Sequence, residues 1–523
     1  MVDGTVGDGD EGDTVRPELA ALRDRLAQTG DEARAADRDK RHGKGYRTAR
    51  ENLADLVDPG SFQEYGQLAV AAQRSRRDYG ELQTRTAADG IITGTARING
   101  ALFGEAATRA AVIINDYAVL AGTQGFFHHR KLDRLCELAA RLALPVVMYT
   151  EGGGGRPGDT DVLTQIAGLN VPSFAAWARL AGRVPRIAVN NGYCFAGNAA
   201  LFGCADFRIA TRRSWIGMAG PAMIEGGGLG CFEPTEIGPI EVQERNGVVD
   251  LVVEDEAAAT TAARQLLGYF QGDLSEWDCA DQAVLRDLVP EDRRWGYPVR
   301  RVIETLADTG SFLELGRVHG RSVITGFLRI EGRPMALLAN DCQQLGGAVD
   351  AEAAEKAARF LTTCNGLGLP VLSLTDTPGF MVGPDSESHA AVRRMAGLFT
   401  AGAALTVPVI AIFLRKGYGL GAMAMVGGSF AEPVYAASWP TGEFGGMGLE
   451  GAVRLGYSKE LSAEPDKASR AALFEKLVAK LYEVGKATEA AAHLEIDAVI
   501  DPADTRAAVR EALTGALGAQ RRR

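Results

Sequence analysis

The sequence of this 523-residue chain contains one series of motifs twice, in the same order. The spacing between matched motifs falls from about 250 residues to about 225 along the chain and then stays nearly constant. The clearest pairs are DPGSFQEYG at 58–66 with DTGSFLELG at 308–316, LALPVVMYTEGGG at 142–154 with LGLPVLSLTDTPG at 367–379, and GYCFAGNAA at 192–200 with GYGLGAMAM at 417–425. Glycine-rich turns that all α/β proteins share would not keep such a register, so the pattern predicts an internal duplication of one fold.

Each copy alternates short apolar runs with longer segments rich in alanine and leucine. The runs AVIIN, PVVMYT, RIAVNN and FRIAT are typical of buried strands. The segments 130–144 and 350–367 carry an apolar stripe at helical spacing. This alternation predicts an α/β fold in which helices cover a mixed or parallel sheet.

The repeat also sets the expected domain boundaries. We place the division near residue 290, which gives an N-terminal domain at 16–290 and a C-terminal domain at 291–523. The first domain begins with a charged helical leader at 16–56. The acidic, glycine-rich segment 1–15 is predicted to be a disordered tail.

In each copy a strand is followed by a glycine turn and by the start of a helix built from small residues. Such a turn leaves backbone N–H groups unpaired, and glycine lets a ligand approach them closely. The arrangement suits a short-lived anion such as an enolate oxygen. The candidate donors are Ala196 and Gly197 in the first copy and Gly421 and Ala422 in the second. The alternative is that these glycines only permit tight packing of helix against strand.

A second glycine-rich turn precedes each of these, EGGGGRPGD at 151–159 and DTPGFMVGPD at 376–385. Arg156 follows the first turn and is a candidate either to bind a phosphate or carboxylate or to pair with Asp159. Lys416 lies beside the second helix start and is a candidate contact for coenzyme A phosphates. Glu225 and Glu450 are conceivable acid–base groups but are more often structural carboxylates.

Other chemistries lack their motifs in this chain. There is no CxxC pair, HExxH, GxSxG or phosphate-binding GxxxxGK[ST], so no metal site or nucleotide loop is predicted. The net charge of −11 argues against a nucleic-acid partner. Seven dispersed cysteines and the lack of a run of about 18 apolar residues favour a cytoplasmic protein outside the membrane.

Five segments together identify a resemblance to a known family: 43–66, EGGGGRPGDTD at 151–161, DTPGF at 376–380, RKGYG at 415–419 and WPTGEFGGMG at 439–448. They resemble the carboxyltransferase (beta) subunit of biotin-dependent acyl-CoA carboxylases, of the propionyl-, methylcrotonyl- and long-chain types. The resemblance runs from about residue 40 to 515. It implies two tandem crotonase-like (ClpP/crotonase) ββα-superhelix domains, which agrees with the repeat.

The resemblance also implies the reaction and the roles of the turns. A carboxyl group would pass from carboxybiotin to the α (or vinylogous) carbon of an acyl-CoA. Ala196 and Gly197 would hold the thioester enolate, with Gly153, Gly154 and Gly155 nearby, and Arg156 among the substrate contacts. Gly421 and Ala422 would hold the ureido oxygen of biotin. Near this second site the substrate contacts would be Pro378, Gly379, Phe380, Lys416 and Ala424.

Two departures from the propionyl type bear on these roles. Each copy has one more residue before its pair of small residues, so the donors are assigned to within one residue. Ala424 stands where propionyl-type sequences place an aspartate, which favours another acyl chain.

The chain has neither a biotinyl MKM motif nor an ATP-binding loop. The resemblance therefore implies a partner (alpha) subunit with biotin carboxylase and biotin carrier modules, and a homohexameric core. Two other hypotheses remain: a biotin-independent acyl-CoA decarboxylase of the same fold, and a non-catalytic scaffold subunit.

Overall fold

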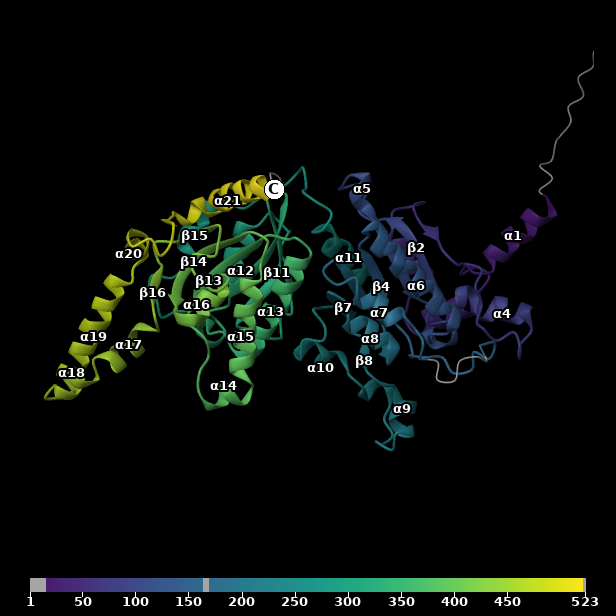
Figure 1. Cartoon of the computed structure of the whole chain (residues 1–523), viewed down its shortest axis with the longest axis horizontal. Coiled ribbons are helices and arrows are strands. Elements are labelled where there is room, and N and C mark those ends of the chain that lie inside the picture. The colour runs from purple at the N-terminus through teal and green to yellow at the C-terminus, as the bar shows by residue number, and fades with distance from the viewer. Residues whose placement is uncertain (1–15, 163–168, 521–523) are drawn as a thin grey trace, which may run out of the picture.

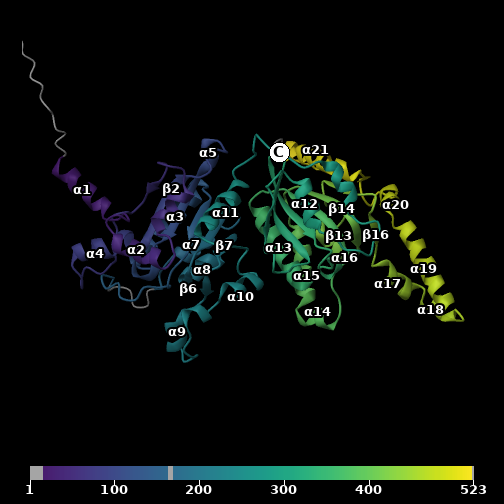
Figure 2. The same cartoon turned by 180° about the vertical axis from the view of Figure 1, so that it is seen from behind.

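The computed structural model describes residues 16–162 and 169–520, and the predicted tail at 1–15 lies outside them. The chain forms two α/β halves that lie side by side, N-terminal in purple to teal and C-terminal in green to yellow (Figure 1). Figure 2 shows the same two halves from behind. The sheets span residues 63–253 and 313–499, so the predicted boundary near 290 lies in the connection between them.

The sheet of the N-terminal half has the order β1-β2-β3-β4-β5-β7-β9. Its strands are β1 (Gln63–Glu64), β2 (Ile91–Arg97), β3 (Arg109–Asn115), β4 (Val146–Tyr149), β5 (Arg186–Asn190), β7 (Phe207–Thr211) and β9 (Leu251–Val253). The first three strands are antiparallel and the others join in parallel. A separate parallel pair, β6 (Tyr193–Phe195) with β8 (Trp215–Gly217), carries the segment that leads to the first small-residue helix.

The sheet of the C-terminal half repeats this order as β10-β11-β12-β13-β14-β15-β17, again with three antiparallel strands followed by parallel ones. Its strands are β10 (Leu313–Leu315), β11 (Val323–Ile330), β12 (Arg333–Asn340), β13 (Val371–Thr377), β14 (Val409–Tyr418), β15 (Tyr435–Ser438) and β17 (Ala498–Val499), while β16 (Glu443–Gly445) pairs with the end of β14. The repeated strand order and directions are what the sequence repeat predicts.

Helices cover both sheets. The N-terminal half contains α1 (Pro17–Ala27), α2 (Ala35–Gly43), α3 (Ala49–Leu56), α4 (Tyr79–Arg85), α5 (Glu105–Thr108), α6 (Phe126–Leu142), α7 (Ser173–Ala178), α8 (Gly197–Gly203), α9 (Pro221–Gly226), α10 (Ile240–Arg245) and α11 (Glu256–Gly268). The C-terminal half contains α12 (Val299–Leu306), α13 (Ala351–Gly366), α14 (Pro384–Ser388), α15 (Ala391–Ala403), α16 (Gly419–Met425), α17 (Leu449–Gly456), α18 (Ser458–Ala463), α19 (Lys467–Val484), α20 (Ala487–Ala492) and α21 (Thr505–Gln520).

Local sequence explains where several of these helices begin. Thr48 and Glu51 form a reciprocal capping box at the start of α3. The carboxylates of Asp255 and Asp350 accept backbone N–H groups in the first turns of α11 and α13. These caps fix the ends of helices whose apolar faces pack on the sheets.

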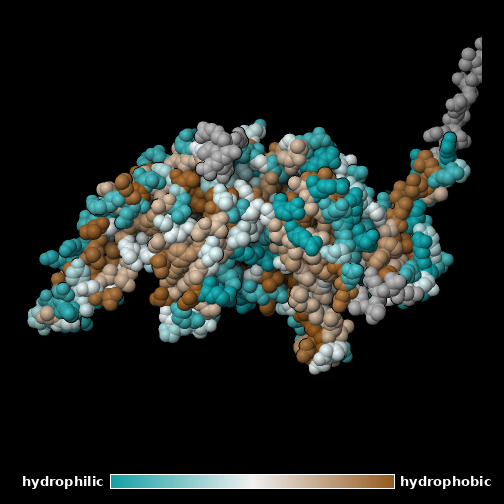
Figure 3. Space-filling view, viewed as in Figure 1, coloured by the Kyte–Doolittle hydropathy of each residue, from teal (hydrophilic) through white to brown (hydrophobic). Residues whose placement is uncertain are grey.

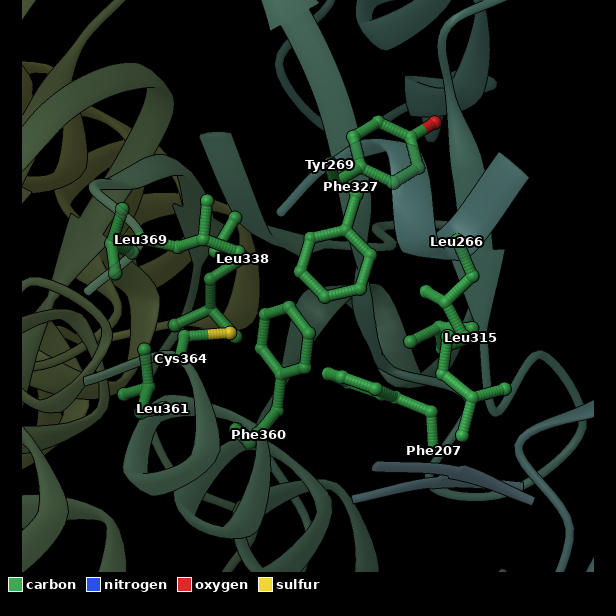
Figure 4. Close-up of a cluster of buried hydrophobic side chains, with 14 of the residues drawn as sticks. Phe207, Leu266, Tyr269, Leu315, Phe327, Leu338, Phe360, Leu361, Cys364 and Leu369 are labelled. Carbon is green, nitrogen blue, oxygen red and sulfur yellow. The ribbon is translucent and has the colours of Figure 1, made fainter. Parts of the chain in front are cut away.

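An aromatic cluster joins the two halves (Figure 4). The ring of Phe327 on β11 lies 5.4 Å from Phe207 and 5.2 Å from Tyr269 of the N-terminal half, and 5.4 Å from Phe360 of its own half. The ring of Phe327 is fully buried. Because its neighbours come from both halves, the two sheets share one continuous apolar core.

An ion-pair cluster lies at the same junction. Asp250, at the end of the N-terminal sheet, accepts hydrogen bonds from Arg208 of its own half and from Arg359 of α13. Burial alone would raise the pKa of Asp250, but the two guanidinium groups outweigh it and hold this pKa at about 2. The carboxylate therefore stays charged and holds the halves together.

One end of the N-terminal half carries exposed apolar side chains. The segment around α9 projects away from the sheet, and Figure 3 shows hydrophobic residues over its surface. Met218, Met223 and Leu229 are each exposed by two-thirds or more. An exposed apolar patch of this kind is typical of a surface that meets another protein.

Candidate functional site

The first glycine turn is tied to the strand and helix that follow it. The N–H of Gly152 donates to the carbonyl of Tyr193 at 2.7 Å, and the N–H of Gly153 donates to that of Ala121 at 3.0 Å. The N–H of Gly154 donates to Oδ1 of Asn198 on α8 at 3.0 Å. Gly153 and Gly154, two of the predicted neighbours of the first site, thus lie in this turn, but their amides are already paired.

The amides that remain available are those of Gly155 and Gly197. Ala196, which caps α8, donates its N–H to the carbonyl of Gly217 at 3.1 Å, so this predicted donor is already in use. Neither Gly155 nor Gly197 has a backbone hydrogen-bond acceptor among the described residues. Gly155 also has open space around the position of a side chain, so packing does not explain why this residue is glycine.

The second glycine turn repeats the backbone pattern of the first. Val349 donates its N–H to Gly379 at 3.0 Å and accepts the N–H of Met381 at 2.9 Å. In the first turn, Gln124 donates to Gly154 at 2.7 Å and accepts from Arg156 at 2.8 Å. The N–H of Phe380 therefore occupies the place of the N–H of Gly155.

Close packing explains part of the glycine content of the second turn. A Cβ at Gly421 would lie 2.5 Å from the carbonyl carbon of Gly379, so only glycine fits between α16 and the turn. Gly379 itself has φ of 117°, a conformation that favours glycine. Ala422 and Ala424 on α16 are fully buried, and Ala424 packs in the apolar core. The side chain of Ala424 therefore does not line a binding surface in this chain.

Both turns begin at a buried carboxylate that an arginine holds. Glu151 accepts two hydrogen bonds from Arg41 of α2, at 2.9 and 2.8 Å. Asp376 lies 3.1 Å from Nη2 of Arg415 and accepts the backbone N–H of Lys416, also at 3.1 Å. These pairs orient the start of each turn.

Arg156 belongs to the support of the first turn. Its guanidinium pairs with Asp89, donates to the carbonyl of Thr123 at 2.8 Å, and is 3% exposed. Asp159 lies 3.7 Å away, as the alternative of internal pairing predicts. Burial raises the pKa of Asp89, and the charge of Arg156 is the main effect that acts against this rise. All of these contacts are with the protein itself, so the N–H donors of the guanidinium are already used to support the turn.

A cavity of about 610 Å³ lies on one side of the first turn, between it and the helical leader. Its wall includes the exposed side chains of Lys40 and Lys44, the rings of Tyr46 and Tyr117, and Arg213. The guanidinium of Arg213 lies 4.1 Å from the centre of the Tyr46 ring. None of these residues was predicted from the sequence, although the basic run RDKRHGK at 38–44 contains Lys40 and Lys44.

A second cavity, of about 690 Å³, lies on the other side of the turn and is lined by Gln124, Gly155 and His129 among others. Nδ1 of His129 lies 2.9 Å from Oγ of Ser173, which donates to Asp133 at 2.5 Å. The neighbouring His128 is fully buried, and burial lowers its pKa well below the ordinary value.

Metal-binding clusters and membrane-spanning helices are both absent from residues 16–162 and 169–520. No group of three or more His, Cys, Asp or Glu side chains is arranged to hold a metal ion. No helix in this part of the chain is long and apolar enough to cross a membrane.

Comparison with known proteins identifies the family. The profile described as the carboxyl transferase domain matches residues 40–522. The chain belongs to the carboxyl transferase family. The methylmalonyl-CoA carboxyltransferase 12S subunit of Propionibacterium freudenreichii is 32% identical over 508 residues, which cover 95% of this chain and 93% of that protein. The biotin-dependent long chain acyl-coenzyme A carboxylase beta4 subunit of Mycobacterium tuberculosis is 31% identical over 522 residues, covering 96% and 94%.

Solved structures agree. A single-chain, multi-domain long-chain acyl-CoA carboxylase is 56% identical with a TM-score of 0.90, covering 95% of this chain and 49% of that one. The chain thus spans about half of that protein. The transcarboxylase 12S structure, described as a hexamer, is 30% identical with a TM-score of 0.82, covering 98% and 96%. The predicted resemblance is confirmed: this chain is a carboxyltransferase of the kind found in biotin-dependent acyl-CoA carboxylases.

Proposed function

We propose that this carboxyltransferase moves a carboxyl group from carboxybiotin to the α-carbon of a long-chain acyl-CoA, within two crotonase-like domains. The observation that carries the proposal is that both glycine turns have the same backbone hydrogen bonds, around Gly155 in the first turn and around Phe380 in the second. Each turn with these hydrogen bonds is called a frame below. The 56% identity to a long-chain acyl-CoA carboxylase supports the choice of acyl chain.

The first frame is proposed to bind the thioester. The free N–H groups of Gly155 and Gly197 would donate to the thioester oxygen, which gains negative charge when the α-proton leaves. Preorganised donors stabilise such an oxygen more in the transition state than in the ground state, and that difference accelerates the reaction.

The second frame is proposed to bind the ureido oxygen of biotin. The N–H of Phe380 and the N–H of Gly421, in the first turn of α16, would supply its donors. Carboxybiotin is a substrate here because a partner carries it; it supplies CO2 and then the base for the α-proton. The protein's own part is to hold both oxygens.

The cavity of about 610 Å³ is proposed to hold the nucleotide end of coenzyme A. Lys40 and Lys44 offer cations for its phosphates, and Tyr46 and Tyr117 offer flat faces for the adenine ring. Lys416 beside the second turn makes no ion pair within the described residues and stays a candidate contact.

Partners follow from the relatives and the surface. We propose a partner with biotin carboxylase and biotin carrier modules, because relatives are named as biotin-dependent carboxylase subunits. A homohexamer is proposed from the 12S structure, and the exposed apolar segment around α9 is the proposed contact between copies. The cysteines within the described residues are unpaired, which supports a cytoplasmic location.

The test is reverse transfer. Purified chain is incubated with malonyl-CoA, methylmalonyl-CoA and longer 2-carboxyacyl-CoAs, with and without free biotin, and the decarboxylated product is followed by mass spectrometry. We expect loss of the carboxyl group only with biotin, and fastest with the longest chain. Loss without biotin would replace the proposal with a decarboxylase.

Matched variants assign the two sites. Gly421→Val is expected to abolish the biotin-dependent reaction, because its side chain enters the space of Gly379. Gly397→Ala on α15, where a Cβ meets nothing within 4 Å, is the control and should keep full activity. Unchanged biotin-dependent turnover in Gly421→Val would refute the role of the second site.

A further inference from the structure

The side chain of Gln124 is a buried polar group that the two backbone donors do not account for. It is 3% exposed, and its Nε2 has no hydrogen-bond partner among the described residues. Buried amide groups in native proteins nearly always have a partner, because an unpaired one loses its hydrogen bonds to water without replacement. Once the amide turns its N–H toward the neighbouring cavity, a ligand there would supply the missing partner.

The backbone holds this side chain at the first turn. Gln124 is bonded on both sides, through its N–H to Gly154 and through its carbonyl to Arg156. Its Oε1 lies 2.2 Å from the point that a Cβ on Gly197 would occupy. The amide therefore fills the space that glycine leaves at position 197, and it lines the cavity of about 690 Å³ together with Gly155.

In the second turn an apolar residue, Val349, stands at the position that Gln124 occupies in the first turn. Val349 makes the same two backbone hydrogen bonds, to Gly379 and from Met381. Its side chain is fully buried in the apolar core. The frame itself thus accepts an apolar residue here, so the fold does not require the amide of Gln124.

We propose that Gln124 is a third donor of the first site, whose side-chain amide hydrogen-bonds the thioester oxygen of the acyl-CoA and binds it more tightly as it becomes an enolate. The Oε1 and Nε2 ends of an amide exchange places by a half-turn about its last carbon–carbon bond, so the N–H can face the cavity. The proposal rests on the proposed function, because it takes the thioester to bind at the first turn.

A comparison of ligands tests the contact with the oxygen itself. Affinities of a long-chain acyl-CoA thioester and of its thioether analogue, which has CH2 in place of C=O, are measured for the full-length chain by calorimetry. Wild type is expected to prefer the thioester by about tenfold or more. Gln124→Met keeps the length of the side chain but has no N–H, and its preference is expected to be about fivefold smaller, as for one neutral hydrogen bond.

The matched control is Gln343→Met, the same substitution at an exposed position of the C-terminal half, which should keep the wild-type preference. An equal preference in wild type and Gln124→Met overturns the proposal. Equal losses of thioester and thioether binding also overturn it, because they mark a structural role. Gln124→Leu is measured as a second variant, and the same outcomes apply to it.

Turnover gives a second readout. In biotin-dependent decarboxylation, Gln124→Met is expected to lower kcat by about 100-fold, the effect of removing one oxyanion donor, with a small change in KM. Unchanged kcat in a folded variant overturns the catalytic role. If wild type itself shows no biotin-dependent turnover, the proposed function fails instead, while the ligand comparison still decides the contact of Gln124.

Discussion

Ala196 adopts a backbone conformation, φ 51° and ψ −118°, that is normally reserved for glycine. It stands where the chain leaves β6 and enters α8, directly before the proposed donor Gly197. Strain of this kind costs about 1–3 kcal/mol and persists where the surrounding structure imposes it. Here the hydrogen bond to Gly217 and the packing against Gly154 impose it.

Ala196→Gly is therefore expected to stabilise the protein. Relief of strain outweighs the extra freedom of glycine in the unfolded chain, for a net gain of about 1 kcal/mol. The thermal midpoint should rise by about 1 °C for a chain of this length. Ala196→Val, with a branched side chain at the same φ, should lower it. A midpoint for Ala196→Gly below that of wild type would contradict the strain.

Lys131 and Lys356 are buried lysines at equivalent places of the two halves. Nζ of Lys356 donates to the carbonyls of Gly316 and His319, at 3.2 and 2.8 Å. Burial lowers the pKa of Lys356 to about 7 and that of Lys131 to about 8. Below these values the folded protein bears the full cost of a buried charge.

Stability is therefore expected to rise with pH above 7. Between pH 7 and about 10 the unfolded state still binds the lysine proton that the folded state has released, so the free energy of unfolding increases by up to about 1.4 kcal/mol per pH unit for Lys356. Lys356→Met removes this term, and its thermal midpoint should rise less than that of wild type from pH 7 to 9.5. Parallel profiles for the two proteins would show that Lys356 keeps its charge.

Helix α2 and its C-cap residue supply basic side chains that line the first cavity. Arg41 fastens this helix to Glu151 at the start of the first turn, which leaves Lys40 and Lys44 exposed on its surface. One residue of α2 thus supports the turn while its neighbours face the cavity.

Lys40→Ala together with Lys44→Ala is expected to raise KM for acyl-CoA about tenfold at unchanged kcat, because phosphate contacts are the same in the ground and transition states. The effect should shrink at high salt, which screens exposed charges. Lys459→Ala with Lys476→Ala, on α18 and α19 of the other half, is the charge-matched control. If both pairs change KM equally, net charge rather than the wall of α2 is responsible.

Elements with strong periodicity were predictable from the sequence. The run FRIAT is strand β7, and the segments 130–144 and 350–367 fall within or near α6 and α13. Strand β16, in the glycine-rich segment GEFG, was not predicted, because its pairing depends on the end of β14 rather than on its own residues. Tertiary contacts decide such short strands.

At the site, the glycine turns were predictable but their free amides were not. The sequence selects Ala196 as readily as Gly197, since only the contact with Gly217 distinguishes them. The role of Arg156 also could not be decided from the sequence, because its partner Asp89 is 67 residues away along the chain. Gln124 gave no signal, since a single glutamine in a glycine-rich loop has no motif.

Across the whole molecule, the two halves retain matched polar contacts as well as matched strands. Arg50 pairs with Glu64 at 2.6 Å in one half, and Arg300 pairs with Glu314 at 2.6 Å in the other. Arg300 also reaches Asp341, whereas the equivalent Asp116 is held by Arg34 of the leader. In the N-terminal half, Arg34 of the leader therefore makes the contact that corresponds to the one between Arg300 and Asp341 in the C-terminal half.

The halves nevertheless share one core, and Phe327 is its centre. Phe327→Ala is expected to cost about 3–5 kcal/mol, because it opens a cavity between Phe207, Tyr269 and Phe360. Since these neighbours belong to both halves, the loss should separate the unfolding of the two halves. Calorimetry should then show two transitions for the variant, and trypsin should cleave faster at the exposed Arg294 of the connection.

Phe413→Ala is the matched control. Phe413 is also fully buried, but its partners Phe430 and Phe444, at 4.6 and 5.1 Å, all belong to the C-terminal half. This variant should lose similar stability without faster cleavage in the connection, because the junction is intact. If both variants unfold in the same way, the aromatic cluster contributes to the stability of the chain but does not couple its halves; separation in Phe327→Ala alone would show that one ring links them.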